Sequence, residues 1–257
     1  MLSLTACTST NRAVTSRKLY NKQLRTYVKS IKNRAPRIID STLVDFMPTV
    51  NFNLRKPNFI IIHHTAQDSL AQTIKTFQLQ KTQVSAHYTI ADDGTVVQML
   101  NEYLRAWHAG AGKWGKNTDI NSASIGIELD NNGTEPFSEF QINSLLKLLK
   151  ALKKEYNIPT ANFIGHSDIA PSRKIDPSVL FPWKTLSEQG FGLWQNEELP
   201  LVPADFNIEQ GLKIIGYDTS NLSAAIIAFK RHFIQTDVSD SIDDTTKAIL
   251  YSIYLKQ

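Results

Sequence analysis

A run of four apolar residues that ends in two histidines constrains the fold of this chain more than any other stretch. Residues Phe59 to Ile62 are all apolar and β-prone, and His63 and His64 follow them directly. A short run of this kind is typical of a strand that is buried on both faces of a sheet. Because α/β sheets place their sites at the carboxyl ends of such strands, the run predicts an α/β fold with a functional histidine at this strand end.

Alternating strand and helix signals continue along the chain. Asp93-Gly94 lies between two β-prone runs and is a strong hairpin signal. The clearest helix extends from Ser138 to Tyr156, with Ser138 and Gln141 in a capping-box pattern and one apolar stripe along its length. The other expected elements are a helix over residues 69–79 and strands over residues 124–129 and 162–164.

The composition changes near residue 184, which indicates a second part of the chain. Two glycines and two prolines between residues 186 and 204 favour a linker, and three short apolar patterns at helical spacing follow Asp205. We therefore expect a basic tether over residues 1–40, a main domain with the chemistry over 41–185, a linker over 186–204 and a helical module over 205–257.

The positive charge of the chain is concentrated at its N-terminus. Residues 1–39 hold nine Lys or Arg and no acid, so the remainder is mildly acidic although the net charge is +4. Such an arm can contact anionic lipid or nucleic acid, or act as a solvated tether. We favour the tether and expect no nucleic-acid partner. No apolar run reaches the roughly 18–20 residues that a membrane span needs.

A second stretch, residues 165–177, holds His166, Lys174 and Asp176 within eleven positions. A zinc site that performs hydrolysis needs three protein ligands and one open position for water. His63 and His166 each follow a predicted strand and supply nitrogens, while Asp176 supplies an oxygen. Since zinc lowers the pKa of bound water to about 7, such a site generates a nucleophile at neutral pH.

Hydrolysis at such a site also needs a group to accept a proton and a cation to stabilise the oxyanion. Glu128, in a β segment that otherwise appears buried, suits the first role, and Lys174, two residues before Asp176, suits the second. Each of these residue types is common on its own, and a single histidine at a strand end is more often structural. The prediction therefore depends on the joint pattern.

Five segments occur in the order seen in zinc-dependent N-acetylmuramoyl-L-alanine amidases, the family that includes the peptidoglycan recognition proteins and phage T7 lysozyme. They are Ile62-His-His-Thr-Ala66, Ser85-Ala-His-Tyr-Thr-Ile90, Ala106-Trp-His-Ala-Gly110, Ile125-Gly-Ile-Glu-Leu129 and Gly165-His-Ser-Asp-Ile-Ala-Pro-Ser-Arg-Lys-Ile-Asp-Pro177. The resemblance covers roughly residues 50–185. It implies a mixed central β-sheet flanked by helices, and the additional C-terminal helices favour the AmiD-like branch, with a small three-helix module.

The resemblance also implies roles for single residues. It implies one zinc ion held by His63, His166 and Asp176, with Glu128 as the catalytic glutamate and Lys174 as the lysine beside the metal. In this family the ligand is the first residue after the apolar strand, which favours His63 over His64.

The implied reaction is hydrolysis of the amide bond between N-acetylmuramic acid and the L-alanine of peptidoglycan or muropeptides, in cell-wall turnover or recycling. Two alternatives stay open. A binding protein on the same fold would hold cell-wall fragments without cleaving them, and its signature would be a missing ligand; none is missing here. A cytosolic amidase would be restricted to anhydro-muropeptides.

Further residues are candidates for the substrate site: His64, His87, Trp107, His108 and Arg173. His64 is expected behind the ligands or in the pocket wall. His87 lies in a predicted strand and is equally well a packed core residue, whereas His108, beside Trp107 in a loop, favours substrate contact. Arg173 either pairs with substrate carboxylates or is a solvated loop residue.

The two ends of the chain suggest where it acts. Leu4-Thr-Ala-Cys7 resembles a bacterial lipobox, which predicts a lipid anchor on Cys7 and a lipoprotein on the periplasmic face of the outer membrane. Only six residues precede Cys7, without the apolar core that secretion requires. A start codon placed too far downstream would account for this; the alternative is a soluble periplasmic or cytoplasmic protein. The C-terminal module is similar to a peptidoglycan-binding module but lacks its Asp-Gly-x-x-Gly turn, so it either binds glycan or supports the main domain.

Overall fold

The computed structural model describes residues 5–32, 38–39, 42–43, 54 and 56–257. They divide into two compact units, Met1–Leu54 and Arg55–Gln257. In the first unit, helix α1 covers Thr5–Lys32. Strands β1 (Ile38–Ile39) and β2 (Thr42–Leu43) form an antiparallel pair.

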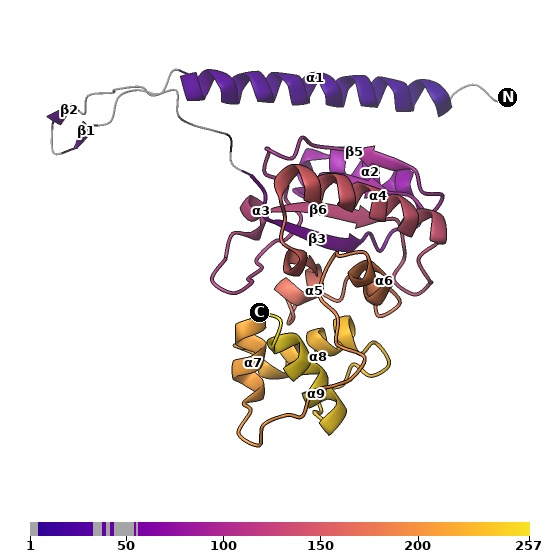
Figure 1. The fold of residues 1–257 in the computed structure, drawn as a ribbon. Helices are drawn as coiled ribbons and strands as arrows, with labels where there is room; N and C mark the ends of the chain where they lie inside the picture. The colour runs from indigo at the N-terminus through magenta and orange to yellow at the C-terminus, as the bar shows by residue number, and fades with distance from the viewer. Residues whose placement is uncertain (1–4, 33–37, 40–41, 44–53, 55) are drawn as a thin grey trace. The chain divides into compact units, whose positions relative to one another are not determined.

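The second unit is built on a five-stranded sheet (Figure 1). Its strands are β3 (Phe59–His64), β4 (Tyr88–Ile90), β5 (Val96–Gln98), β6 (Ser124–Leu129) and β7 (Phe163–Gly165). The strand order is β5-β4-β6-β3-β7. Strand β3 is parallel to both of its neighbours and β4 is parallel to β6, whereas the β4–β5 hairpin is antiparallel. The predicted mixed sheet is confirmed, with the apolar run that precedes the two histidines in an interior strand.

Helices cover both faces of this sheet. The helices between residues 70 and 188 are α2 (Leu70–Gln78), α3 (Ile120–Ala123), α4 (Glu139–Tyr156), α5 (His166–Ile169) and α6 (Trp183–Glu188). Single 3-10 turns lie at Gln80–Thr82 and Thr160–Asn162. The last three helices are α7 (Ile208–Ile215), α8 (Leu222–Phe233) and α9 (Asp244–Tyr254).

Helix α4 begins where the capping residues predict, but only half of the capping box forms. The Ser138 hydroxyl accepts a hydrogen bond from the backbone N–H of Gln141, as an N-cap does. The Gln141 side chain does not return to Ser138; its amide donates to the carbonyl oxygens of Ile90 and Asp130 instead. Gln141 is fully buried, so its amide ties the helix to the ends of β4 and β6.

Alternation along the strands gives the sheet one apolar face and one polar face. Successive side chains in a strand point to opposite faces, and residues opposite each other in the register share a face. One face packs against α4 and α6 in the main core, which includes Ile60, Ile62, Ile90, Ile125, Ile127, Leu129, Leu145, Leu149, Phe163, Trp183 and Leu186. On the other face His63 is opposite Glu128, and Ile61, opposite Gly126, joins a smaller apolar cluster. The register therefore places two ionisable side chains side by side.

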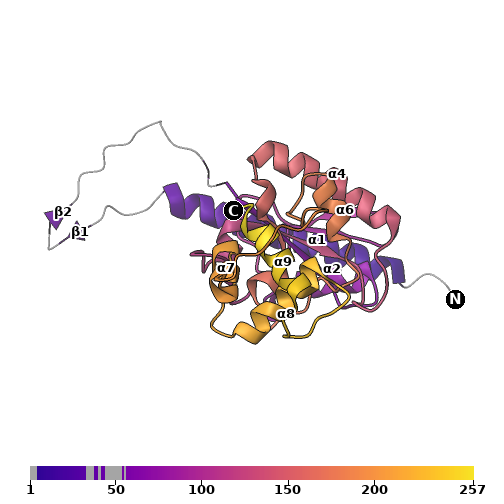
Figure 2. The ribbon, with the colours of Figure 1, turned by 60° about the horizontal axis from the view of Figure 1, so that its bottom comes forward.

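The last three helices, α7 to α9, have an apolar core of their own and lie together at one end of the unit (Figures 1 and 2). Side chains from outside these helices, Trp114 and Trp194, pack against this core. Helix α8 also contacts the short helix α5, which follows β7 in the sheet. The three helices belong to the same compact unit as the sheet.

Two expectations concern a membrane. The side chain of Cys7 lies outside the described residues, so a lipid anchor on this residue stays a prediction. Among the helices that the structure describes, none combines the length and the apolar composition that crossing a bilayer requires.

Candidate metal centre and active site

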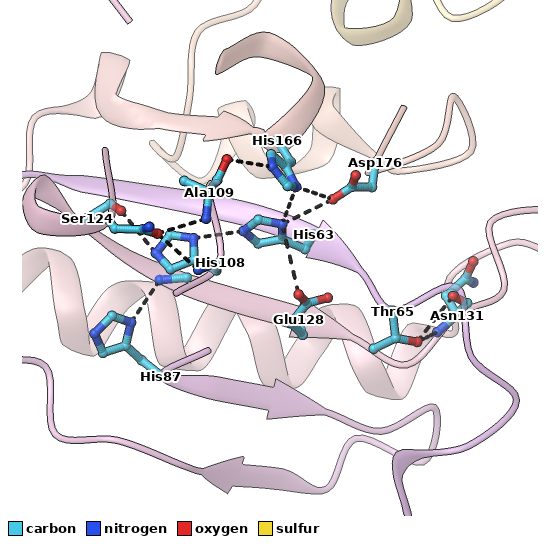
Figure 3. Close-up of polar contacts among 12 residues, drawn as sticks. His63, Thr65, His87, His108, Ala109, Ser124, Glu128, Asn131, His166 and Asp176 are labelled. Atoms are coloured by element: carbon cyan, nitrogen blue, oxygen red, sulfur yellow. Dashed lines mark hydrogen bonds and ion pairs between the residues drawn. The ribbon is translucent and has the colours of Figure 1, made fainter. Parts of the chain in front are cut away.

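Four ionisable side chains from separate parts of the chain meet at the polar face of the sheet (Figure 3). His63 lies near the carboxyl end of β3, and Glu128 lies beside it on β6. His166 is the first residue of α5, directly after β7, and Asp176 follows in the next loop. The three strands are parallel, so their carboxyl ends reach the same edge of the sheet, where α/β folds place their sites.

Three of these side chains point one atom each at a common centre. The distance between Nδ1 of His63 and Nδ1 of His166 is 2.9 Å, and Oδ2 of Asp176 is 3.1 Å from the first and 3.0 Å from the second. All three residues are buried, with 1%, 3% and 7% of their surface exposed. They form a group that could hold a metal ion.

Hydrogen bonds behind His63 determine which of its ring nitrogens carries the proton. The Ser124 hydroxyl donates to the carbonyl oxygen of Ile120 at 2.6 Å, so its oxygen accepts from Nε2 of His108 at 3.2 Å. Burial, followed by the neighbouring His63, lowers the pKa of His108 well below its usual value, so the ring is neutral and Nδ1 has no proton. This Nδ1 therefore accepts from Nε2 of His63 at 3.0 Å.

The same argument applies to the other histidine. Nε2 of His166 lies 3.1 Å from the carbonyl oxygen of Ala109, which only accepts, so this nitrogen carries the proton. Burial, and then the neighbouring His166, lowers the pKa of His63 to about 4. In neutral imidazoles with these tautomers, both Nδ1 atoms have a lone pair and no proton.

With both rings neutral, the centre therefore consists of two nitrogen lone pairs and a carboxylate oxygen, about 3 Å apart. Electron pairs at this separation repel one another unless a cation lies between them. Two imidazole nitrogens and one carboxylate oxygen are the donor set of a catalytic zinc site, which keeps a further position open. The residues present thus fit a zinc ion, and the fit follows from the direction of the hydrogen bonds around them.

Glu128 lies beside this centre with a free oxygen. Its Oε1 is 4.0 Å from Nδ1 of His63, while its Oε2 is buried and has no hydrogen-bond partner. Burial, and secondly the charge of Asp176, raises the pKa of Glu128 to about 8, and the charge of Lys174 opposes this rise. A bound cation would act in the same direction as Lys174 and favour the ionised carboxylate. Lys174 itself is half-buried in the loop before Asp176.

Two of the histidines predicted at the substrate site are buried and use both ring nitrogens within the protein. His87 is fully buried; its Nε2 donates to the carbonyl oxygen of Leu104 and its Nδ1 accepts from the backbone N–H of Gly126. His108 is only 8% exposed and uses both ring nitrogens on His63 and Ser124. His87 is thus packed in the core, His108 lies behind His63, and substrate contact by either residue stays a prediction.

The other three candidates occupy different places. His64 lies on the opposite face of β3 from His63, and its Nδ1 accepts from the backbone N–H of Ser178 at 3.2 Å. Trp107 is half-exposed, at 49%. The exposed Arg173 donates to the carbonyl oxygen of Ala109 at 2.7 Å and to a second carbonyl oxygen two residues later. Its guanidinium therefore holds the loop that carries His108.

Sequence reasoning missed the residues that hold this arrangement from behind. Asn121 accepts hydrogen bonds from the backbone N–H groups of His108 and Ala109 at 3.0 and 2.8 Å. Asp168, two residues after His166, is fully buried and bonded to His232 of α8 at 2.8 Å. No spacing rule links these positions, because the partners lie on elements far apart in the chain.

Comparison with known proteins agrees with this geometry. Residues 53–179 match the N-acetylmuramoyl-L-alanine amidase family. N-acetylmuramoyl-L-alanine amidase AmiD of Escherichia coli K12 is 33% identical over 229 residues, which are 77% of this chain and 82% of the relative. The 1,6-anhydro-N-acetylmuramyl-L-alanine amidase AmpD of Haemophilus influenzae is 38% identical over 108 residues, which are 42% of this chain and 59% of that relative.

Solved structures extend the similarity to the fold. A complex of E. coli AmiD with anhydro-N-acetylmuramic acid-L-Ala-D-γ-Glu-L-Lys has a TM-score of 0.71 at 30% identity, covering 85% of this chain and 96% of that one. AmpDh3 of Pseudomonas aeruginosa, in complex with anhydromuramic pentapeptide, has a TM-score of 0.72 at 28% identity and covers 82% and 96%. The resemblance inferred from the five sequence segments is confirmed, and the chain belongs to the N-acetylmuramoyl-L-alanine amidase family.

Proposed function

We propose that this chain hydrolyses the amide bond between N-acetylmuramic acid and L-alanine with one zinc ion held by His63, His166 and Asp176. The observation that carries the proposal is the convergence of two ring nitrogens and one carboxylate oxygen beside the unpartnered oxygen of Glu128. Membership of the amidase family supports the reaction. The named ligands of AmiD and AmpDh3 support anhydro-muropeptides as the substrate class.

Each proposed residue has a defined task. Zinc, when bound, supplies Lewis-acid polarisation and lowers the pKa of water. His63 and His166 contribute neutral nitrogens, and Asp176 contributes the negative charge that partly balances the ion. Glu128 accepts a proton from the attacking water and later returns it to the leaving amine, since its Oε2 has no partner within the protein.

Lys174 supplies positive charge to the oxygen on which negative charge develops. Its position in the loop before Asp176 brings its charge close enough to change the pKa values of Glu128 and His63. In a buried site of low dielectric such a charge stabilises a developing oxyanion more strongly than it would in water. The same positive charge favours the ionised form of Glu128.

An assay with purified protein tests the activity. Anhydro-muropeptide is incubated with the protein as prepared, after chelation, and after chelation followed by stoichiometric zinc, and the release of free stem peptide is followed by mass spectrometry. We expect release that disappears on chelation and returns with zinc. Binding of muropeptide without release of peptide under every condition would instead identify a non-catalytic binding protein.

We also propose that the chain is a lipoprotein on the periplasmic face of the outer membrane, anchored through Cys7. The lipobox-like Leu4-Thr-Ala-Cys7 segment and the basic helix that follows it support this proposal. Cells expressing the gene with its natural upstream region are labelled with a palmitate analogue and fractionated. We expect labelled protein in the outer membrane and loss of the label in Cys7→Ser; an unlabelled soluble protein would refute the anchor.

A further inference from the structure

With a neutral His108 ring, the hydrogen-bond chain behind His63 has one direction at every link. It runs from Nε2 of His63 to Nδ1 of His108, from Nε2 of His108 to Oγ of Ser124, and from this hydroxyl to the carbonyl oxygen of Ile120. The carbonyl can only accept, so every proton in the chain points away from His63. All three side chains are buried.

We propose that His108 and Ser124 are positioning residues that hold His63 in the Nε2–H tautomer and so keep its Nδ1 lone pair directed at the metal. The inference rests on the metal site of the proposed function and goes beyond it. It assigns a task to two residues that touch neither the metal nor the substrate.

The reverse tautomer of His63 would disrupt two contacts at once. Its bare Nε2 would face the bare Nδ1 of His108 at 3.0 Å, where two lone pairs repel. Its Nδ1 proton would occupy the centre, where it can form a hydrogen bond to Asp176 and block the binding of a cation. Without the chain, this second contact would favour the wrong tautomer. The chain therefore determines whether the ligand atom is available.

The His108 ring packs tightly against the backbone of β6 at Gly126. A Cβ atom at Gly126 would lie 2.4 Å from Cγ of the His108 ring, so the strand has no side chain where the ring rests. Asn121 fixes the backbone of His108 and Ala109. Because the carbonyl oxygen of Ala109 accepts from His166, one two-residue segment orients both histidines. Outer hydrogen bonds of this kind typically change metal affinity by about 10–100-fold when they are removed.

Three variants of the full chain test the proposal. His108→Leu removes the acceptor for His63, whereas His108→Asn keeps an oxygen close to the place of Nδ1. Ser124→Ala removes a single oxygen and is the milder change if His108→Leu does not fold. The matched control is His87→Leu, which removes another fully buried histidine whose two ring nitrogens bond to backbone groups and not to His63.

The first measurement is the tautomer of His63 in metal-free protein, read from long-range ¹H–¹⁵N NMR spectra of the ring. We expect Nε2–H in the wild type and in His87→Leu. In His108→Leu and Ser124→Ala we expect a shift toward Nδ1–H. This measurement requires neither zinc nor activity, so a protein that proves not to be an amidase would still give an answer.

The second measurement is zinc affinity by competition with a chromophoric chelator. We expect the affinity to fall about 10–100-fold in His108→Leu, less in Ser124→Ala and less in His108→Asn, and to stay unchanged in His87→Leu. Wild-type tautomer and affinity in folded His108→Leu or Ser124→Ala would overturn the proposal. An equal loss of affinity in His87→Leu would do the same, because it would show a general effect of lost packing.

Discussion

At the scale of single residues, strand alternation decides which of two adjacent histidines can bind a metal. His63 and His64 are chemically identical, yet they point to opposite faces of β3. His63 faces the side of the sheet that carries Glu128, while His64 accepts a hydrogen bond from the backbone of Ser178. The sequence predicted this choice through the family pattern, and the register gives its physical reason.

Replacement of Glu128 separates catalysis from metal binding. Glu128→Gln keeps the shape of the side chain but cannot accept a proton, so we expect hydrolysis to fall by about 10²–10⁴-fold with an unchanged zinc content. His166→Ala removes one of the three proposed ligands and should lose the metal itself. Metal content by mass spectrometry and turnover of muropeptide check both variants. Equal loss of zinc in the two would show that Glu128 is structural.

A methyl group on the polar face of β6 should disturb the site indirectly. In Gly126→Ala the new Cβ would lie 2.4 Å from the His108 ring, so the ring or the strand must move. Overpacking of this kind destabilises proteins by about 1–3 kcal/mol. Equilibrium unfolding in urea measures the change. An unchanged urea midpoint would mean that the His108 ring can move aside without loss of stability.

At the scale of elements, a buried carboxylate joins the C-terminal helices to the helix that begins with His166. Asp168 of α5 accepts hydrogen bonds from the backbone of Gly165 at 2.7 Å, from Tyr217 at 2.7 Å and from His232 at 2.8 Å. The His232 ring is stacked on Trp183 with 3.8 Å between ring centres. We therefore propose that residues 205–257 support the metal site, whether or not they also bind glycan.

Removal of the His232 ring tests this connection. His232→Ala leaves Asp168 short of one donor and opens a cavity beside Trp183, so we expect a loss of about 2–4 kcal/mol in the free energy of unfolding. The control is Lys213→Ala in the same group of helices. It removes an exposed pair with Glu209 and should change stability by no more than about 1 kcal/mol. Similar losses of stability in both variants would show that the contact between His232 and Asp168 has no specific role.

At the scale of the whole molecule, the sheet and helices α7 to α9 form one compact unit. The proposed ligands come from β3, from α5 and from the loop after it, and α5 is bonded to α8 through Asp168. A ligand that binds only the folded state stabilises everything that unfolds with its site. Metal binding should therefore stabilise the C-terminal helices as well as the sheet against unfolding.

Removal of zinc should lower the stability of this unit as a whole. At a free zinc concentration of about 1,000 times Kd the stabilisation is about 4 kcal/mol, which for a unit of this size raises Tm by on the order of 10 °C. Scanning calorimetry with and without chelator measures the shift, and hydrogen exchange follows amides in α9. If zinc protected the sheet but left α9 unchanged, the C-terminal helices would unfold independently.

Much of the fold could be predicted because its signals are local. The apolar run at β3, the Asp-Gly hairpin turn and the Ser138 cap each act through neighbouring residues. The motif order also identified the members of the metal group, His63, His166 and Asp176, which the structure brings together. Local signals failed at Gln141. Its side chain does not complete the predicted capping box but donates to the carbonyl oxygens of Ile90 and Asp130.

The sequence by itself determined the family, the mixed α/β sheet and the side chains that reach the site, because strand periodicity and the ordered motifs are properties of short segments. Only the tertiary structure decided that His108 lies behind His63 and that His232 holds Asp168. A histidine in a loop looks the same in sequence whether it faces substrate or a ligand. The difference is the direction of a hydrogen bond between residues far apart in the chain, and folding alone brings the donor and the acceptor together.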